Sequence, residues 1–262
     1  LAALASLARA ARKRSAAQII AITGSVGKTG TKASLANALA KSGRTHAAER
    51  SFNNHIGVPL SLARLPQDAA YGVFELGMNH AGEIAALVNM VRPHCAIITT
   101  IAAAHIENFD SMDALAAAKA EILTGIEAGG SAVLPFDNGY FDMLRQQAEA
   151  RALKIIGFST EGHEAADSYV SRAKLHSACS CVTAMLGSQA VTYKVGAPGI
   201  HLVANSLAVL SAVQLVGGDL ALAALSLAEH DGLAGRGARY RLGADDAPIT
   251  LIDESYNASP VA

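Results

Sequence analysis

The stretch QIIAITGSVGKTGTK, residues 18–32, decides the fold of this 262-residue chain. It opens with an apolar run typical of a buried strand, and a helix-like stretch follows it. Between the two lies a strand-to-helix turn, Gly24-Ser25-Val26-Gly27-Lys28-Thr29-Gly30. Glycine permits turns and close backbone approaches that a side chain would block. The pattern therefore predicts a phosphate-binding loop at the start of an α/β domain.

The loop is a shortened form of the general Walker pattern, because Ile22 stands where that pattern has its first glycine. Its chemistry is nevertheless complete. Successive backbone N–H groups and the N-terminus of the following helix attract a polyphosphate. Lys28 adds a full positive charge near the outer phosphates, and the Thr29 hydroxyl can ligate Mg²⁺. The alternative is a plain turn that uses two glycines, but the preceding strand and the Lys-Thr pair favour a nucleotide-binding loop.

Composition excludes several classes of protein. Hydrophobic residues make up 51% of the chain, much of it alanine, and no stretch reaches the roughly 18 strongly apolar residues of a membrane span. A net charge of −1 gives no general attraction to nucleic acid or anionic lipid. Three cysteines argue against a disulfide framework and for a reducing, cytoplasmic setting. Cys179 and Cys181 lack the spacing of common zinc or redox pairs, so we interpret them as strand residues.

Strand-like and helix-like runs alternate along most of the chain. YGVFELG, CAIITTIA, SAVLPF and LKIIGFS are strand-like, whereas HAGEIAALVNMV and SMDALAAAKAEILTGIEAGG are helix-like. Such alternation predicts a mostly parallel sheet with helices on both faces. From residue 168 the runs SYVSRAKLHSACSCVTAML and AVTYKV flank GSQ, which predicts a small antiparallel β insertion. Two further helices are expected over 200–218 and 220–233.

The first fifteen residues, LAALASLARAARKRS, are basic and contain no acid. They predict an amphipathic helix whose apolar face holds Leu1, Leu4, Leu7 and Ala11. A transit peptide is the alternative, because such peptides are also basic and poor in acids.

Three further stretches carry a resemblance to a known family: SFNNHIGVPLSL at 51–62, FELGMNHAGEI at 74–84 and AAAHIENFDSMDALAAAKAEI at 102–122. With TGSVGKT they resemble the Mur ligases, the ATP-dependent amide-forming enzymes of peptidoglycan precursor synthesis. PGIHLVANSLA, AGRG and IDESYNASP extend the match over nearly the whole chain. The resemblance implies three parts. We expect a linker helix from an N-terminal UDP-binding domain at 1–16, a central ATP-binding domain at 17–244, and the start of a C-terminal ligase domain at 245–262.

The substrates follow from the same resemblance. NNHIG and ELGMNH are most similar to the members that join D-alanyl-D-alanine to UDP-N-acetylmuramoyl-tripeptide through an acyl phosphate. Another Mur-type or polyglutamate-adding ligase stays open as an alternative, and so does a nucleotide-binding module without ligase chemistry. We expect a monomer that binds no nucleic acid and has no membrane span.

The resemblance also implies the residues that handle metal and catalysis. Thr29 and Glu75 would hold one Mg²⁺, and His105 a second. Lys119 would react with CO₂ to give a carbamate beside the metals, which makes Lys28, His105 and Lys119 the expected catalytic residues. On the residues alone, a solvated glutamate, a structural histidine and a solvated helix lysine remain the alternatives.

The remaining expected contacts concern the two substrates. Asn53, Asn54, Asn79 and His80 would face the muramoyl peptide, although asparagine also favours such loops as a turn residue. Asn205 would reach the adenine, Arg236 the ribose and phosphates, and Asp253 the ribose; the alternative for Asn205 is a polar residue inside a helix. Gly30 departs from the family, which usually has Thr or Ser there, so one hydroxyl contact to the nucleotide is lost.

Overall fold

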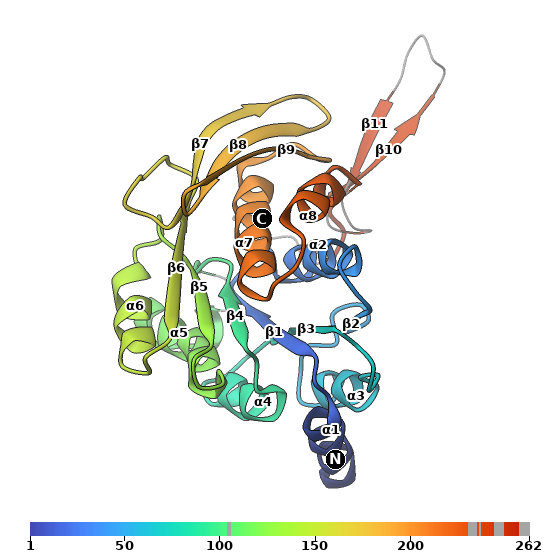
Figure 1. Cartoon of the computed structure of the whole chain (residues 1–262), viewed down its shortest axis with the longest axis vertical. Coiled ribbons are helices and arrows are strands. Elements are labelled where there is room, and N and C mark those ends of the chain that lie inside the picture. Colours follow the sequence, from blue (N-terminus) through green and yellow to red (C-terminus); the bar gives the residue numbers. More distant parts are fainter. Residues whose placement is uncertain (104–105, 230–234, 236, 244–248, 257–262) are drawn as a thin grey trace.

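The computed structural model describes residues 1–103, 106–229, 235, 237–243 and 249–256 (Figure 1). One large sheet is built from β1 (Gln18–Thr23), β2 (Thr45–Ala47), β3 (Tyr71–Glu75), β4 (Cys95–Ile98), β5 (Ser131–Pro135), β6 (Lys154–Ser159), β7 (Ser168–Leu175), β8 (Ser180–Leu186) and β9 (Gln189–Val195). Its order is β2-β3-β1-β4-β5-β6-β7-β8-β9. Neighbours from β2 to β7 are parallel, and β8 and β9 continue the sheet in antiparallel pairing. The predicted α/β class is confirmed.

Helices cover both faces of the sheet. They are α1 (Ala2–Arg14), α2 (Lys28–Ala40), α3 (Gly57–Ala63), α4 (Glu83–Val91), α5 (Met112–Ala120), α6 (Phe141–Glu149), α7 (Ile200–Leu215) and α8 (Leu220–Ser226), with short 3-10 turns at Ile106–Asn108, Glu121–Gly125 and Leu227–Glu229. Successive side chains of a strand point to opposite faces. Ile19 accordingly belongs to the core cluster that holds buried residues of α1 and α3 to α6, whereas Ile20 belongs to the cluster that holds those of α2, α7 and α8.

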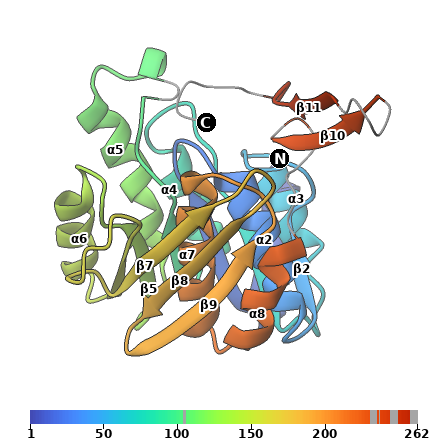
Figure 2. The ribbon, with the colours of Figure 1, turned by 90° about the horizontal axis from the view of Figure 1, so that it is seen from above.

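The antiparallel insertion differs from its prediction in one respect. The run 168–186 contains two strands, β7 and β8, because a tight turn at His176–Cys179 reverses the chain. With β9, these strands lie as a layer across α7 (Figure 2). That helix is therefore enclosed by sheet on two sides, and Val203, Leu207 and Leu210 are fully buried. Burial on most of its circumference explains why α7 is apolar nearly all round.

A separate hairpin of β10 (Ala238–Leu242) and β11 (Ile249–Asp253) projects from the body in Figure 1. The expected boundary at 244/245 falls between these two paired strands. Hairpin strands form one folding unit, and where the chain divides into domains stays a prediction.

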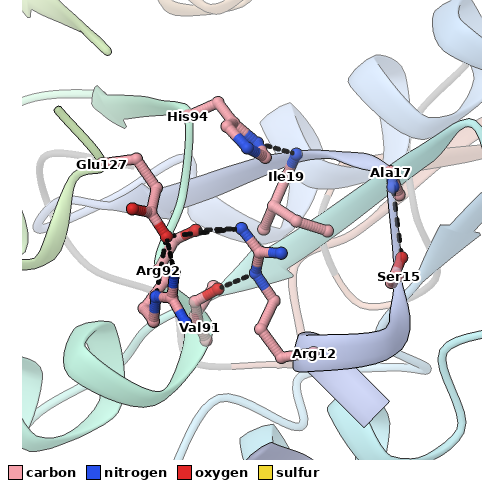
Figure 3. A network of polar contacts seen from close by, with 8 residues as sticks. All are labelled: Arg12, Ser15, Ala17, Ile19, Val91, Arg92, His94 and Glu127. Carbon is pink, nitrogen blue, oxygen red and sulfur yellow. Dashed lines mark hydrogen bonds and ion pairs between the residues drawn. The ribbon is translucent and has the colours of Figure 1, made fainter. Parts of the chain in front are cut away.

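At the amino ends of the parallel strands, a polar network fastens α1 to the body (Figure 3). Arg12 donates through Nε to the Val91 carbonyl at 2.8 Å and through Nη2 to the Arg92 carbonyl at 2.8 Å, so it caps the C-terminal end of α4. Glu127 accepts a 2.7 Å bond from Arg92 and lies 3.7 Å from Arg12. Burial and the Arg12 charge lower the pKa of His94, whose neutral Nδ1 accepts the Ile19 N–H at 2.9 Å.

The helix expected at the start of the chain is confirmed, and its buried face was predicted in part. Ala11 is buried and Leu4 half-buried as expected, but Leu1 and Leu7 are 75% and 63% exposed, and Ala8 and Arg12 are buried in their place. The guanidinium replaces an apolar anchor because the carbonyl groups at the end of α4 need donors.

Candidate active site

The predicted phosphate loop lies at the carboxyl end of β1, between β3 and β4 in the sheet. Gly27 caps α2 with φ 84°, and Gly24 has φ 146°, both angles that other residues rarely adopt. A Cβ on Gly24 would strike the Thr99 side chain. The Ser25 hydroxyl donates to the Ala102 carbonyl at 2.7 Å and accepts the Ala102 N–H at 2.9 Å. The loop is therefore held in one shape by the segment after β4.

Lys28 curls back over this loop. Its Nζ donates to the carbonyl oxygens of Gly24 at 2.7 Å and Ser25 at 3.1 Å, and its side chain is half-buried. The ammonium group thus lies at the mouth of the loop and beside the first turn of α2. The N–H groups of a first helical turn have no acceptors within the helix and favour an anion.

Glu75 ends β3, directly opposite Ile22 in the neighbouring strand. It is 1% exposed, so the solvated-glutamate alternative is wrong. Its Oε1 accepts a 2.7 Å bond from Asn53 Nδ2. Its Oε2 is buried without a hydrogen-bond partner among the described residues, and it forms only a long ion pair of 3.9 Å with Lys32 Nζ. A buried carboxylate oxygen that lacks a donor is costly unless a cation joins it.

Thr29, in the first turn of α2, is also buried. Its hydroxyl lies 3.3 Å from the Ser51 hydroxyl, so segment 48–54 reaches the phosphate loop. Thr29 and Glu75 both lie at the carboxyl edge of adjacent strands, where open parallel sheets bind ligands.

Lys119 lies on α5 and is 2% exposed, which excludes the solvated-lysine alternative. Burial and then the charge of Lys28 lower its pKa to about 7. Two lysines from different helices therefore face the same region, and one of them can lose its proton near neutral pH.

The residues expected to contact the muramoyl peptide divide into two kinds. Asn53 is half-buried and joined to Glu75, whereas Asn54 uses its Oδ1 to accept the N–H groups of Ile56 at 3.1 Å and Gly57 at 2.9 Å. Asn79 and His80 are exposed, and their N–H groups bond to Glu83, whose pKa they lower. Turn chemistry thus accounts for Asn54, and its substrate contact stays a prediction.

On the other side of the loop, α7 brings Asn205 over Gly27. A Cβ on Gly27 would lie 3.0 Å from the Asn205 amide, a tight contact, and the φ of 84° also favours glycine at this position. Asp253 accepts the N–H groups of Gly235 at 2.8 Å and Ser255 at 3.1 Å. A hydrogen bond from the Ser255 side chain, and then these two N–H groups, lower its pKa. His105 and Arg236 lie outside the described residues.

Some residues of this site carry no motif of their own. Lys32 lies one helical turn after Lys28 and is buried, and Asn138 donates to the Ile101 carbonyl at 2.9 Å, which braces the segment after β4. Only the four-residue spacing of the two lysines, which places them on one helix face, could have pointed to Lys32.

Comparison with known proteins identifies the family. The model of the Mur ligase middle domain matches residues 22–213. The chain belongs to the Mur ligase family. It is 36% identical over 255 residues to the UDP-N-acetylmuramoyl-tripeptide–D-alanyl-D-alanine ligase of Escherichia coli (strain K12), covering 97% of this chain and 55% of that protein. The ligase of the same name from Bacillus subtilis (strain 168) is 31% identical over 263 residues, covering 100% of this chain and 54% of that protein.

Solved structures agree with this Mur ligase assignment. A crystal structure of MurF from Acinetobacter baumannii superposes with a TM-score of 0.91 at 30% identity, over 99% of this chain and 55% of that chain. The chain thus spans about 55% of the length of such relatives. Among the described residues, no helix combines the length and apolar composition of a membrane span.

Proposed function

We propose that this chain is the middle part of an ATP-dependent ligase that joins D-alanyl-D-alanine to UDP-N-acetylmuramoyl-tripeptide. The names of its relatives support this function, and one feature carries it for this chain. Glu75 is buried with an oxygen that lacks a donor among the described residues, beside a glycine loop with a lysine at its mouth. In an ordinary core this combination would only lower stability, whereas a site for a metal–nucleotide complex requires it.

The residues of the loop fit a triphosphate. Gly24 and Gly27 leave space that a Cβ would fill, and backbone N–H groups at the start of α2 supply donors. We assign Gly24, Ser25, Val26, Gly27, Lys28, Thr29 and Gly30 to the phosphates of ATP. Asn205, Arg236 and Asp253 are assigned to its nucleoside, Asn205 because it lies against Gly27.

The donor set also fits magnesium, which prefers hard oxygen ligands. We assign Thr29 and Glu75 to one ion, and His105 with the carbamate of Lys119 to a second. Two bound ions neutralise phosphate charge and orient the transferred group.

Lys119 is suited to carbamate formation. The reaction needs a neutral amine, and a pKa of about 7 leaves a large neutral fraction at physiological pH. The amine adds to CO₂, a proton leaves, and the side chain becomes an anion. The repulsion from Lys28 that lowers its pKa then becomes an attraction. Carbon-13 NMR of protein equilibrated with labelled bicarbonate should show a carbamate signal that is missing from Lys119→Met; equal spectra would contradict the assignment.

The reaction proceeds in two transfers. The tripeptide carboxylate attacks the γ-phosphorus of ATP, the bond to the bridging oxygen breaks, and ADP leaves. The amine of the dipeptide then attacks the acyl phosphate through a tetrahedral intermediate, releasing inorganic phosphate and a proton. Lys28 and the loop N–H groups would stabilise charge on the transferred group, while Asn53, Asn54, Asn79 and His80 hold the muramoyl peptide.

We further propose that residues 1–16 lead from a UDP-binding domain, that residues 17–237 form the ATP-binding domain, and that the β10–β11 hairpin opens the ligase domain. The exposed apolar side chains Ile249, Leu251 and Ile252 support the last division, because an isolated hairpin cannot bury them. Three free cysteines support a cytoplasmic setting. We take the enzyme to act as a monomer.

The test is ADP release by the full-length protein, supplied with UDP-muramoyl-tripeptides that end in diaminopimelate or lysine. Release that depends on D-alanyl-D-alanine is the expected result, and the two tripeptides identify the acceptor. Release that depends instead on another amino acid, such as glutamate, would indicate a different ligase of the family. Calorimetric binding of Mg²⁺–ATP without any release would support the nucleotide-binding module, and absence of both would overturn the proposal.

A further inference from the structure

Lys32 is a buried ammonium group that the proposed reaction does not use. It follows Lys28 by one turn of α2 and is 4% exposed. Its Nζ donates to the carbonyl oxygen of Ala48 at 2.8 Å and to that of Arg50. Both carbonyl groups belong to the segment between β2 and α3. This segment also carries Asn53 and Asn54, which we expect to contact the UDP-muramoyl-tripeptide, called the acceptor below.

A buried charge is expensive, and an apolar side chain of similar length would fill the space at lower cost. The ammonium instead fixes a particular backbone shape. Arg50 has φ 47°, an angle that non-glycine residues rarely adopt. A strained residue persists only where its surroundings hold it, and here its carbonyl is held by Lys32.

The same segment contacts the phosphate and metal side of the site at two further points. Ser51 reaches the Thr29 hydroxyl at 3.3 Å, and Asn53 donates to Glu75 at 2.7 Å. Beyond these side chains, the Gly77 N–H donates to the Asn53 carbonyl at 2.8 Å. Lys32 itself lies 3.9 Å from the other oxygen of Glu75. One ammonium therefore stands between the helix that begins at the phosphate loop, the carboxylate at the end of β3, and the Asn53 segment.

We propose that Lys32 is a positioning residue that sets segment 48–53 against Thr29 and Glu75, so that occupation of the nucleotide site organises the side that receives the muramoyl peptide. Binding of nucleotide and of acceptor is then coupled through this segment. The inference rests on the proposed function, because it needs both ligands to bind this chain. A lysine that merely fills the core would stabilise the fold without coupling the two sites.

The experiment uses the full-length ligase and equilibrium binding. Calorimetry measures the dissociation constant of the UDP-muramoyl-tripeptide with and without Mg²⁺ and a non-hydrolysable ATP analogue. For Lys32→Met we expect acceptor binding with nucleotide to weaken about tenfold or more, and binding without nucleotide to change less than about threefold, within the usual range of coupling between sites. Lys32→Arg should restore much of the loss, because it keeps the charge and the donors.

Lys41→Met is the matched control, since Lys41 ends the same helix but pairs with Glu229 at the surface. It should behave as wild type. If Lys32→Met fails to fold, Ser51→Ala replaces it, with the same direction and a loss of about threefold or more. The inference is overturned if the variant binds the UDP-muramoyl-tripeptide equally more weakly with and without nucleotide. It is also overturned if nucleotide strengthens this binding in the variant as much as in wild type. Failure of the wild-type protein to bind the acceptor or to release ADP overturns the proposed function instead.

Discussion

The amino and carboxyl ends of the parallel strands differ in whether their buried polar and charged groups have partners. At the amino ends, Arg12 meets two carbonyl groups and a carboxylate, and His94 accepts a backbone N–H. At the carboxyl ends, Glu75 keeps an oxygen without a donor among the described residues, and Lys119 is buried with a pKa of about 7. Polar groups have partners at the amino ends, and at the carboxyl ends we expect a ligand to complete them.

The contrast separates stability from function within one sheet. Satisfied buried groups fix the fold, because each lost partner leaves a desolvated group behind. Unsatisfied groups lower stability, so they persist where a bound ion or substrate completes them. Substitutions at the carboxyl ends should therefore change activity with little loss of stability, and substitutions at the amino ends should do the opposite.

The largest effect is expected for Lys28→Ala. This change removes the ammonium at the mouth of the loop, and ADP release by the full-length ligase should fall by about 10³-fold, in the range of losses when a group that stabilises a transferring phosphoryl is removed. The melting temperature should barely change, since Lys28 is half-buried and donates to carbonyl groups of the loop itself. Lys41→Ala serves as the control, and a comparable loss of activity there would contradict the comparison.

Arg12→Met probes the opposite end of the sheet. The carbonyl groups of Val91 and Arg92 lose their donor, which should lower the free energy of unfolding by about 3 kcal/mol, as for hydrogen bonds to a charged group. Scanning calorimetry of the full-length protein measures the shift in the unfolding transition of the part that contains the large sheet. Calorimetric affinity for Mg²⁺–ATP should stay within about twofold of wild type, and a large change in affinity would show that the two ends are not independent.

Most of the fold could be predicted because the sequence patterns that mark its strands and helices are local. Apolar runs marked β1, β3, β4, β5 and β6, and the glycine loop fixed the first strand-to-helix turn. The three-residue β2 was missed because so short a strand has no periodicity to read. The turn at His176–Cys179 was missed for lack of a glycine or proline to mark it.

For the site, motifs located Thr29, Glu75 and Lys119, and the structure found all three buried. Their roles stay predictions, and so do those of His105 and Arg236, which lie outside the described residues. Lys32 and Arg12 were not recognised, because a lysine or arginine on a helix is usually solvated. Their burial depends on carbonyl groups that the fold brings in from 18 and 80 residues away.

Lys119→Met tests the comparison through the pH dependence of the free energy of unfolding. The native pKa of about 7 lies below the ordinary lysine pKa of 10.5, so between these values the unfolded chain binds more protons, and wild-type stability should rise with pH across that window. The variant lacks this slope. It should therefore be more stable than wild type by about 2 kcal/mol near pH 7, with the difference shrinking toward pH 9. Urea unfolding at several pH values in CO₂-free buffer measures it, and parallel slopes would contradict the burial argument.

The smallest expected effect concerns Asn54, where turn chemistry and substrate contact compete as explanations. Its Oδ1 accepts two N–H groups at the start of α3, so Asn54→Ala should cost about 1 kcal/mol of stability, as for other lost helix caps. Asn54→Ser keeps a capping oxygen but loses the amide. If Asn54 only shapes the turn, the serine variant should match wild type both in melting temperature and in KM for the muramoyl peptide. If the amide also holds the substrate, KM should rise severalfold while the melting temperature stays unchanged, and this divergence would place Asn54 with the functional groups of the carboxyl ends.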